Sequence, residues 1–363
     1  MQSKYDVDLY RCDWPQFHWQ ASLRRVPAII LLLLAGIYFH QVAPLVLAAA
    51  SALSVGLGAS RQVRGSRLLA MITVTLLMSF SAWVGSLAGN IYLVALLVTA
   101  IWGLACGLIN VLNEDMGWIV MQSVIAQLVG TAFPSHGMEA AGRALFILLG
   151  GLAQIVCISS LWYLQGISRF GDEISPASAP PKDLPRFPEL WKILHESLFS
   201  SSNAFRYAVR VAITLLIAVE LDHLLKLKNG YWLPMTTLVI LKPDFYRTYA
   251  NGVQRVIGTL AGVIAATIIA HLLQPQNFVL IALVGIFGFF GYAFQKANPV
   301  VFSASITSFV VFLIALTGLP ESTVTWHRLI NTALGCALAL LARFVSLKLL
   351  RPVIPHFPAN ISR

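Results

Sequence analysis

Residues 68–113 read LLAMITVTLLMSFSAWVGSLAGNIYLVALLVTAIWGLACGLINVLN and contain no Asp, Glu, Lys or Arg. A helix needs about 20 apolar residues to cross the hydrocarbon core of a bilayer, so this run is long enough for two crossings. Gly89 and Asn90 lie near its middle and are typical of a tight turn. The stretch therefore predicts two membrane helices joined at that turn.

The composition of the whole chain agrees with this interpretation. Hydrophobic residues make up 58% of the 363 residues, charged residues make up 11%, and the mean hydropathy is +0.76. A soluble domain of average composition is about 45–50% apolar and about 25% charged. Water could not solvate a chain this apolar, so we predict an integral membrane protein with lipid as its solvent, and not a soluble enzyme.

The remaining apolar runs extend the pattern along the chain. Residues 26–60 and 256–295 are also free of Asp, Glu, Lys and Arg. We predict an all-α, polytopic membrane protein with about twelve transmembrane helices. The predicted spans are 26–40, 43–60, 68–88, 91–112, 117–133, 142–165, 205–225, 231–242, 253–273, 278–295, 299–319 and 327–349.

A proline- and serine-rich segment, residues 166–203, interrupts the apolar runs and is typical of a linker. It divides the chain into two predicted six-helix membrane repeats, residues 26–165 and 204–351. Residues 1–25 and 352–363 are predicted to be cytoplasmic tails, and the linker is predicted to be cytoplasmic as well.

Matching arginines suggest that the two halves are related. Arg67 and Arg143 are 76 residues apart, Arg255 and Arg328 are 73 residues apart, and a glycine follows each later arginine by seven residues (Gly150 and Gly335). Because each half has an even number of predicted spans, the halves would be parallel repeats about an axis along the membrane normal.

The net charge of +10 is explained by membrane topology. With the N-terminus in the cytoplasm, 21 of the 25 Lys and Arg residues fall on the cytoplasmic side and 4 on the other side. This split obeys the positive-inside rule, so we predict that both termini are cytoplasmic. The basic balance therefore does not indicate nucleic-acid binding.

The most informative polar stretch is residues 229–262, NGYWLPMTTLVILKPDFYRTYANGVQRVIGTLAG. Its apolar part, residues 231–241, would span only about 17 Å as a helix, which is less than the bilayer core of about 30 Å. Either the helix begins earlier, through residues 224–228, or it is a half-helix bracketed by Pro234 and Pro243. Short, proline-interrupted segments of transporter repeats often form the binding site, although an ordinary short span is an equally good interpretation.

Basic residues follow this broken segment and are the predicted anion ligands: Lys242, Arg247 and Arg255. A cation at membrane depth needs a cavity, a carboxylate or an anionic substrate, although each could instead snorkel to lipid phosphates. Asp244 either pairs with a neighbouring cation or carries a coupling proton. The first-half equivalents of these cations are Arg61, Arg64 and Arg67.

Further polar residues complete the predicted site. Tyr231 and Trp232 either belong to an interfacial aromatic belt or stack against an aromatic substrate. Arg143 and Arg328 either line the outer mouth of an anion path or cap neighbouring helices. The four cysteines are far apart, and no HExxH or GxSxG motif is present, so we predict no metal, no cofactor and no enzymatic activity.

The run Tyr231-Trp232, Thr236-Thr237, Leu241-Lys242-Pro243-Asp244, Thr248 and Arg255-x-x-Gly258-Thr259-x-x-Gly262 resembles the fusaric-acid-resistance-like family. That family includes bacterial aromatic acid exporters, and plant malate channels are distantly similar. The resemblance implies an inner-membrane, proton-driven exporter of weak organic acids whose binding residues include Thr236 and Thr237. Many relatives carry a large cytoplasmic domain that residues 166–203 do not match, and Lys242 stands where Gln is common.

The predicted function is thus a proton-coupled exporter of small, aromatic organic acids in the inner membrane. The alternative is an anion channel on the same scaffold, and a membrane-embedded enzyme or a non-transporting subunit is less well supported. The expected partners are the lipid bilayer and small organic anions. A homo-oligomer and a periplasmic adaptor protein are left open, and no nucleic acid is expected.

Overall fold

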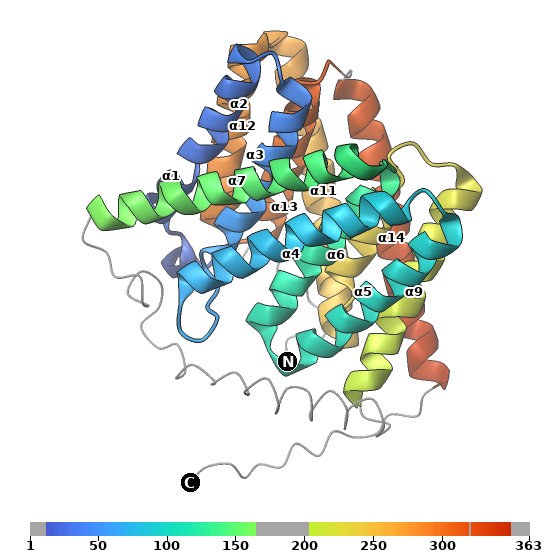
Figure 1. Ribbon diagram of the computed structural model, residues 1–363. Helices are drawn as coiled ribbons and strands as arrows, with labels where there is room; N and C mark the ends of the chain where they lie inside the picture. The colour runs from blue at the N-terminus through green and yellow to red at the C-terminus, as the bar shows by residue number, and fades with distance from the viewer. Residues whose placement is uncertain (1–11, 165–202, 319–320, 350–363) are drawn as a thin grey trace.

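The computed structural model describes residues 12–164, 203–318 and 321–349, and this part of the chain consists of helices and their connecting loops (Figure 1). The predicted C-terminal tail, residues 352–363, lies outside the described residues. So does the predicted linker, except for Asn203.

Each of the twelve ranges predicted as a span coincides with one helix. The largest difference is at α11, which begins at Phe245, eight residues before the predicted start at 253. The turn predicted at Gly89 and Asn90 is confirmed, because α4 ends at Ala88 and α5 begins at Tyr92. The helices are α2 (Pro27–Tyr38), α3 (Val42–Gly58), α4 (Arg67–Ala88), α5 (Tyr92–Leu112), α6 (Glu114–Ala132), α7 (Gly137–Leu164), α9 (Asn203–Leu225), α10 (Trp232–Ile240), α11 (Phe245–Leu273), α12 (Asn277–Phe294), α13 (Pro299–Ala315) and α14 (Glu321–Leu349).

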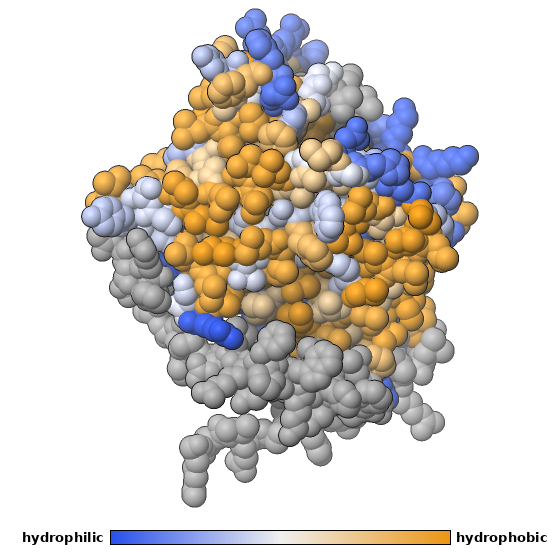
Figure 2. Space-filling view, in the orientation of Figure 1, coloured by the Kyte–Doolittle hydropathy of each residue, from blue (hydrophilic) through white to orange (hydrophobic). Residues whose placement is uncertain are grey.

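Seven of the described helical stretches are long and apolar enough to cross a bilayer, so the chain is a multi-pass membrane protein. They are Trp14–Tyr38, Arg67–Ala88, Tyr92–Leu112, Gly137–Leu164, Phe245–Leu273, Asn277–Phe294 and Thr325–Ser346. Two shorter apolar helices, α3 and α13, accompany them. Figure 2 shows a broad apolar surface over the face that carries α4, α5 and α7, which is the face expected against lipid tails.

The end of the predicted N-terminal tail is folded against the helices. A short 3₁₀ helix, η1 (Trp14–Gln16), precedes α1 (Trp19–Arg25), and α1 packs on α12 and α7. The Asp13 amide donates to the Ala297 carbonyl at 2.9 Å, and the Arg25 side chain is buried. This part of the predicted tail therefore packs on the helices, with the Phe17 ring 5.0 Å from the Phe294 ring of α12.

The same helix pairings occur in both halves. In the first half α2 packs on α3, α3 on α7, α4 on α6 and α7, and α5 on α6. In the second half α9 packs on α10, α10 on α14, α11 on α13 and α14, and α12 on α13. The halves meet along α5 and α9, and α12 packs on α1 and α2.

Glycines bring several of these pairs into backbone contact. A Cβ atom at Gly150 of α7 would lie 2.0 Å from the Ala48 carbonyl oxygen of α3. One at Gly335 of α14 would lie 2.8 Å from the Leu233 carbonyl oxygen of α10. The Gly85/Gly89, Gly103/Gly107 and Gly258/Gly262 pairs likewise face the backbones of α6, α9 and α13. Such small residues let membrane helices approach closely.

Candidate functional site: a cationic cavity between the two halves

A cavity of about 700 Å³ lies between the halves of the chain. Four helices provide most of its lining, namely α3 and α6 from the first half and α10 and α13 from the second. Helices α4, α7, α11 and α14 add a few side chains each. The volume is within the range of about 300–1,000 Å³ that is usual for sites of small molecules.

The lining is mostly apolar, but it contains five basic side chains. Among the described residues that line the cavity there is no Asp or Glu. An apolar wall lowers the local dielectric constant and strengthens the attraction of these cations for an anion. The arrangement can therefore hold an anion that also has an apolar part. The basic residues are Arg61, Arg143, Lys242, Arg255 and Arg328.

Helix α10 supplies Trp232 to the lining, and Tyr231 directly precedes this helix. It has nine residues and is separated from α9 by a connection in which Lys226 and Asn229 have left-handed backbones (φ 48° and 53°). The predicted alternative of a helix that starts at residues 224–228 is therefore wrong, and α10 is a short, separate helix. Trp232 at its start is 4% exposed.

Aromatic contacts connect α10 to both halves. The Tyr231 ring lies 5.6 Å from the Phe133 ring at the end of α6 and 5.5 Å from the Trp232 ring. The guanidinium carbon of Arg328 lies 5.0 Å from the centre of the Trp232 ring, which is a cation–π contact. These four residues therefore form a continuous row along one end of the cavity.

The two predicted threonines have different surroundings. Thr236 lines the cavity. The Thr237 hydroxyl is close to two carbonyl oxygens, that of Leu233 at 2.9 Å and that of Gly335 at 3.2 Å, and it is fully buried. Thr237 therefore joins α10 to α14 and is not part of the cavity lining.

Arg255 lies inside α11 and contributes to the cavity lining. Ten residues separate it from Phe245, so it lies roughly 15 Å along the helix axis from the start of α11. Its Nε atom is buried and has no hydrogen-bond partner within the described part of the chain. The residue as a whole is half-buried, and a cation there without a carboxylate partner among the described residues is costly, so Arg255 is a candidate anion ligand.

Arg247 and Asp244 are exposed and lie outside the cavity lining. The Asp244 carboxylate accepts a hydrogen bond from the Arg247 amide at 3.1 Å and caps the N-terminus of α11. A capping role accounts for Asp244 without proton coupling. The binding role of Arg247 and the coupling role of Asp244 stay predictions.

The replacement Asp244→Asn should leave substrate flux, its dependence on a pH gradient and the thermal unfolding midpoint unchanged, because Asn is also a good cap. Asp244→Ala should lower the free energy of unfolding by about 1 kcal/mol through loss of the cap. Flux assays in liposomes and thermal unfolding in detergent measure the two effects. A loss of pH-driven flux in Asp244→Asn with normal stability would instead support proton coupling.

The three first-half arginines have different surroundings. Arg64 is exposed and has a left-handed backbone (φ 49°) in the loop before α4. Arg67 is buried and lies outside the cavity lining. Arg61 lines the cavity and forms an ion pair with Asp115 at 3.0 Å.

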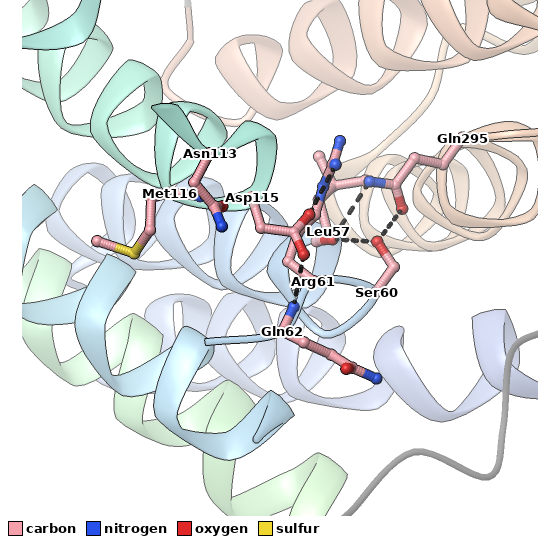
Figure 3. A network of polar contacts seen from close by, with 8 residues as sticks. All are labelled: Leu57, Ser60, Arg61, Gln62, Asn113, Asp115, Met116 and Gln295. Atoms are coloured by element: carbon pink, nitrogen blue, oxygen red, sulfur yellow. Dashed lines mark hydrogen bonds and ion pairs between the residues drawn. The ribbon is translucent and has the colours of Figure 1, made fainter. Parts of the chain in front are cut away.

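A polar network surrounds this ion pair (Figure 3). The second carboxylate oxygen of Asp115 accepts from the Gln62 amide at 3.2 Å. On the other side of Arg61, the Gln295 side chain donates to the Leu57 carbonyl at 3.2 Å, and the Ser60 hydroxyl lies between them. The network therefore connects the end of α3, the start of α6 and the end of α12.

Arg143 and Arg328 both line the cavity. Arg143 donates to the Ser86 hydroxyl at 2.5 Å and to the Phe133 carbonyl, so it joins α7 to α4 and to the end of α6. Arg328 is 6% exposed and stacks on Trp232, and its Nε atom has no hydrogen-bond partner among the described residues.

Several lining residues were missed in the sequence. Asn251 and Gln254 belong to the 229–262 segment. Asn251 lies one helical turn before Arg255 and Gln254 lies one residue before it, so both could have been predicted as lining residues. Asp115, which holds Arg61 but is not itself a lining residue, carried no such signal. The missed lining residues include Phe133, Trp118, Gln122, Asn251, Gln254 and Gln295.

Comparison with known proteins confirms the predicted resemblance for the second half of the chain. Residues 212–342 match the family described as fusaric acid resistance protein-like. This range contains α10, α11 and most of α14, which carry Trp232, Arg255 and Arg328. No solved structure matches the chain.

Curated relatives match part of the chain. The uncharacterized protein slr1298 of Synechocystis sp. is 30% identical over 152 residues, which is 41% of this chain and 20% of the relative. Inner membrane protein YccS of Escherichia coli is 28% identical over 52% of this chain and 25% of the relative. The uncharacterized transporter YdhK of Escherichia coli is 26% identical over 38% of this chain and 21% of the relative. The chain thus spans a quarter or less of each of these relatives.

Proposed function

We propose that this protein is an inner-membrane transporter of small organic anions, with aromatic carboxylates as the preferred substrate class. The observation that supports this most is the cavity of about 700 Å³, in which five basic side chains lie in a mostly apolar wall that also contains aromatic and uncharged polar side chains. Arginine binds a carboxylate through two parallel hydrogen bonds, while Tyr231 and Trp232 offer ring faces to an aromatic group. The names of the relatives agree with transport and not with catalysis.

The proposed architecture is twelve membrane segments in two parallel repeats with both termini in the cytoplasm. The five recurring helix pairings and the glycine contacts at Gly150 and Gly335 support the repeat. The position of the cavity, between equivalent helices of the two halves, is typical of transporters built from repeats. The distribution of Lys and Arg supports the orientation. A homo-oligomer and a periplasmic adaptor protein belong to the same proposal, and co-purification would test both.

Export driven by the proton gradient is the first candidate mechanism, because the family resemblance implies it. An anion channel is the second. The specific observation in favour of a channel is that no carboxylate is present among the described residues of the cavity lining, so a proton has no acidic carrier there. In either mechanism the cavity binds the same class of anion.

Purified protein in liposomes should transport benzoate in a saturable manner and faster than protein-free liposomes do. If a pH gradient drives accumulation against the benzoate gradient faster than in protein-free liposomes, which benzoic acid enters by diffusion, the protein is a coupled exporter. If the current reverses at the Nernst potential of the anion, the protein is a channel. Absence of flux for benzoate and for a panel of other organic acids would refute the proposed function.

A further inference from the structure

We infer that the anion is bound by cations of the second half, Arg255, Arg328 and Lys242, while their first-half counterparts Arg61 and Arg143 are positioning residues that hold the cavity wall. This inference rests on the proposed function and divides the five cavity cations into two classes. The division follows from which of them already have partners within the protein.

The first comparison is between Arg143 and Arg328, which occupy equivalent places in α7 and α14. Arg143 is engaged by the Ser86 hydroxyl and the Phe133 carbonyl, so its guanidinium is already used in joining three helices. The Nε atom of Arg328 has no hydrogen-bond partner among the described residues, and the guanidinium stacks on the face of Trp232. A guanidinium that is stacked on a ring keeps its edge free for a carboxylate.

The second comparison is between the loops that follow α3 and α10. Arg61 follows α3 and is neutralised by Asp115, which also accepts from the Gln62 amide. Lys242 follows α10 and lines the same cavity, but no carboxylate of the described chain is within ion-pair distance of it. The corresponding start of α13 reads Asn298, Pro299, Val300 and has no acid where α6 has Asp115.

The third comparison is between Arg67 and Arg255, near the start of the third segment of each half. Arg67 is buried outside the cavity lining, whereas Arg255 is part of the lining. The difference arises because α11 begins ten residues before Arg255, while α4 begins at Arg67. Arg255 consequently lies about three turns inside its helix, whereas Arg67 is the first residue of its helix.

Together the three comparisons assign the available positive charge to the second half of the chain. The three second-half cations approach it from α11, α14 and the loop after α10, and the aromatic residues Tyr231 and Trp232 are on α10 beside them. This combination suits a carboxylate joined to a planar ring, because the ring can lie against α10 while Arg255 and Arg328 bind the carboxylate.

The test measures binding of benzoate by calorimetry and thermal unfolding for five single variants: Arg255→Gln, Arg328→Gln, Arg61→Gln, Arg143→Gln and Arg67→Gln. The two second-half variants should weaken benzoate binding by roughly 10- to 100-fold, because each removes a charged hydrogen-bond donor from the ligand. Their unfolding midpoints should be unchanged or higher, since a buried cation without a carboxylate is removed. The three first-half variants should keep the affinity within about threefold. Arg61→Gln and Arg143→Gln should unfold at lower temperature.

Two controls separate the contribution of the positive charge from that of the planar guanidinium, and test whether the ligand must be an anion. Arg255→Lys and Arg328→Lys should recover part of the lost affinity, since they restore the charge but not the planar guanidinium. Benzamide, a neutral analogue, should bind wild type weakly and should not distinguish the Gln variants from it. If wild type binds no organic acid, the proposed function fails. If wild type binds benzoate and the first-half variants lose as much affinity as the second-half variants, or if no variant loses any, this inference is overturned.

Discussion

Replacing Gly150 by alanine is expected to lower the free energy of unfolding by about 3 kcal/mol, at the upper end of the usual cost of adding an atom to a packed interior. The new Cβ would lie 2.0 Å from the Ala48 carbonyl oxygen and 2.8 Å from the Ala48 Cα atom. Both are backbone atoms, so no side-chain rotation relieves the overlap, and α3 would have to move away from α7. Thermal unfolding in detergent, followed by near-ultraviolet circular dichroism, measures the loss.

Gly142 provides a matched control in the same helix, because a Cβ atom there meets no atom within 4 Å. Gly142→Ala should be neutral or stabilising by up to about 1 kcal/mol, owing to the higher helix propensity of alanine. Equal effects of the two replacements would mean that α3 and α7 do not pack as the structure shows.

The equivalent replacement in the second half, Gly335→Ala, tests whether the cavity depends on the same kind of contact. Its Cβ would lie 2.8 Å from the Leu233 carbonyl oxygen and 3.0 Å from the Thr236 Cβ, so the overlap is smaller than at Gly150. Because α10 carries Tyr231 and Trp232, a shift of this helix should weaken benzoate binding more than it lowers stability. Gly150→Ala should instead lower stability more than it weakens benzoate binding.

Much of the helix layout could be predicted from the sequence. A long charge-free run predicts a membrane helix without knowledge of its tertiary contacts, because a span must have a minimum length and must satisfy its own backbone hydrogen bonds. The turn at Gly89 and Asn90 then divides one such run into two helices. Pro234 and Pro243 marked α10 as a short helix because proline removes a backbone donor. Arg143 and Arg328, which the repeated spacing of arginines had singled out, both line the cavity, while the repeat itself stays a prediction.

The roles of individual cations could not be predicted, because they depend on partners that are distant in the chain. Arg143 and Arg328 look alike in sequence, but Arg143 donates to Ser86 and to the Phe133 carbonyl, whereas Arg328 stacks on Trp232. The ion pair of Arg61 with Asp115 joins residues from two helix ends, and no local pattern indicates it. Asp244 is different, because an Asp before a helix is a usual N-cap signal, and reading it so would have predicted the early start of α11.

The ion pair of Arg61 and Asp115 gives the second large expected effect. Asp115→Arg would place two guanidinium groups together and remove the acceptor of the Gln62 amide. Close like charges cost several kcal/mol when fully buried, and since both side chains are partly exposed we expect a loss of about 2 kcal/mol in the free energy of unfolding. The exchanged pair, Arg61→Asp with Asp115→Arg, should recover about half of this loss.

Recovery should be partial for two physical reasons. Arginine at position 115 lies in the first turn of α6, where the helix dipole favours a negative charge, and it cannot accept from the Gln62 amide. A double-mutant cycle on the unfolding free energies isolates the pairwise interaction. If the exchanged pair were no more stable than Asp115→Arg alone, the two side chains would not be in contact.

Asp115→Asn tests the same pair through binding. The amide keeps an acceptor for the Gln62 amide but no longer neutralises Arg61. One more cation of the cavity lining therefore becomes available to an anion. Benzoate affinity should therefore rise a few-fold and become more sensitive to salt, because the added attraction is electrostatic. The variant Asp115→Asn with Arg61→Gln should return the affinity to the wild-type value. An unchanged affinity in Asp115→Asn would mean that Arg61 does not reach the anion even when its carboxylate partner is removed.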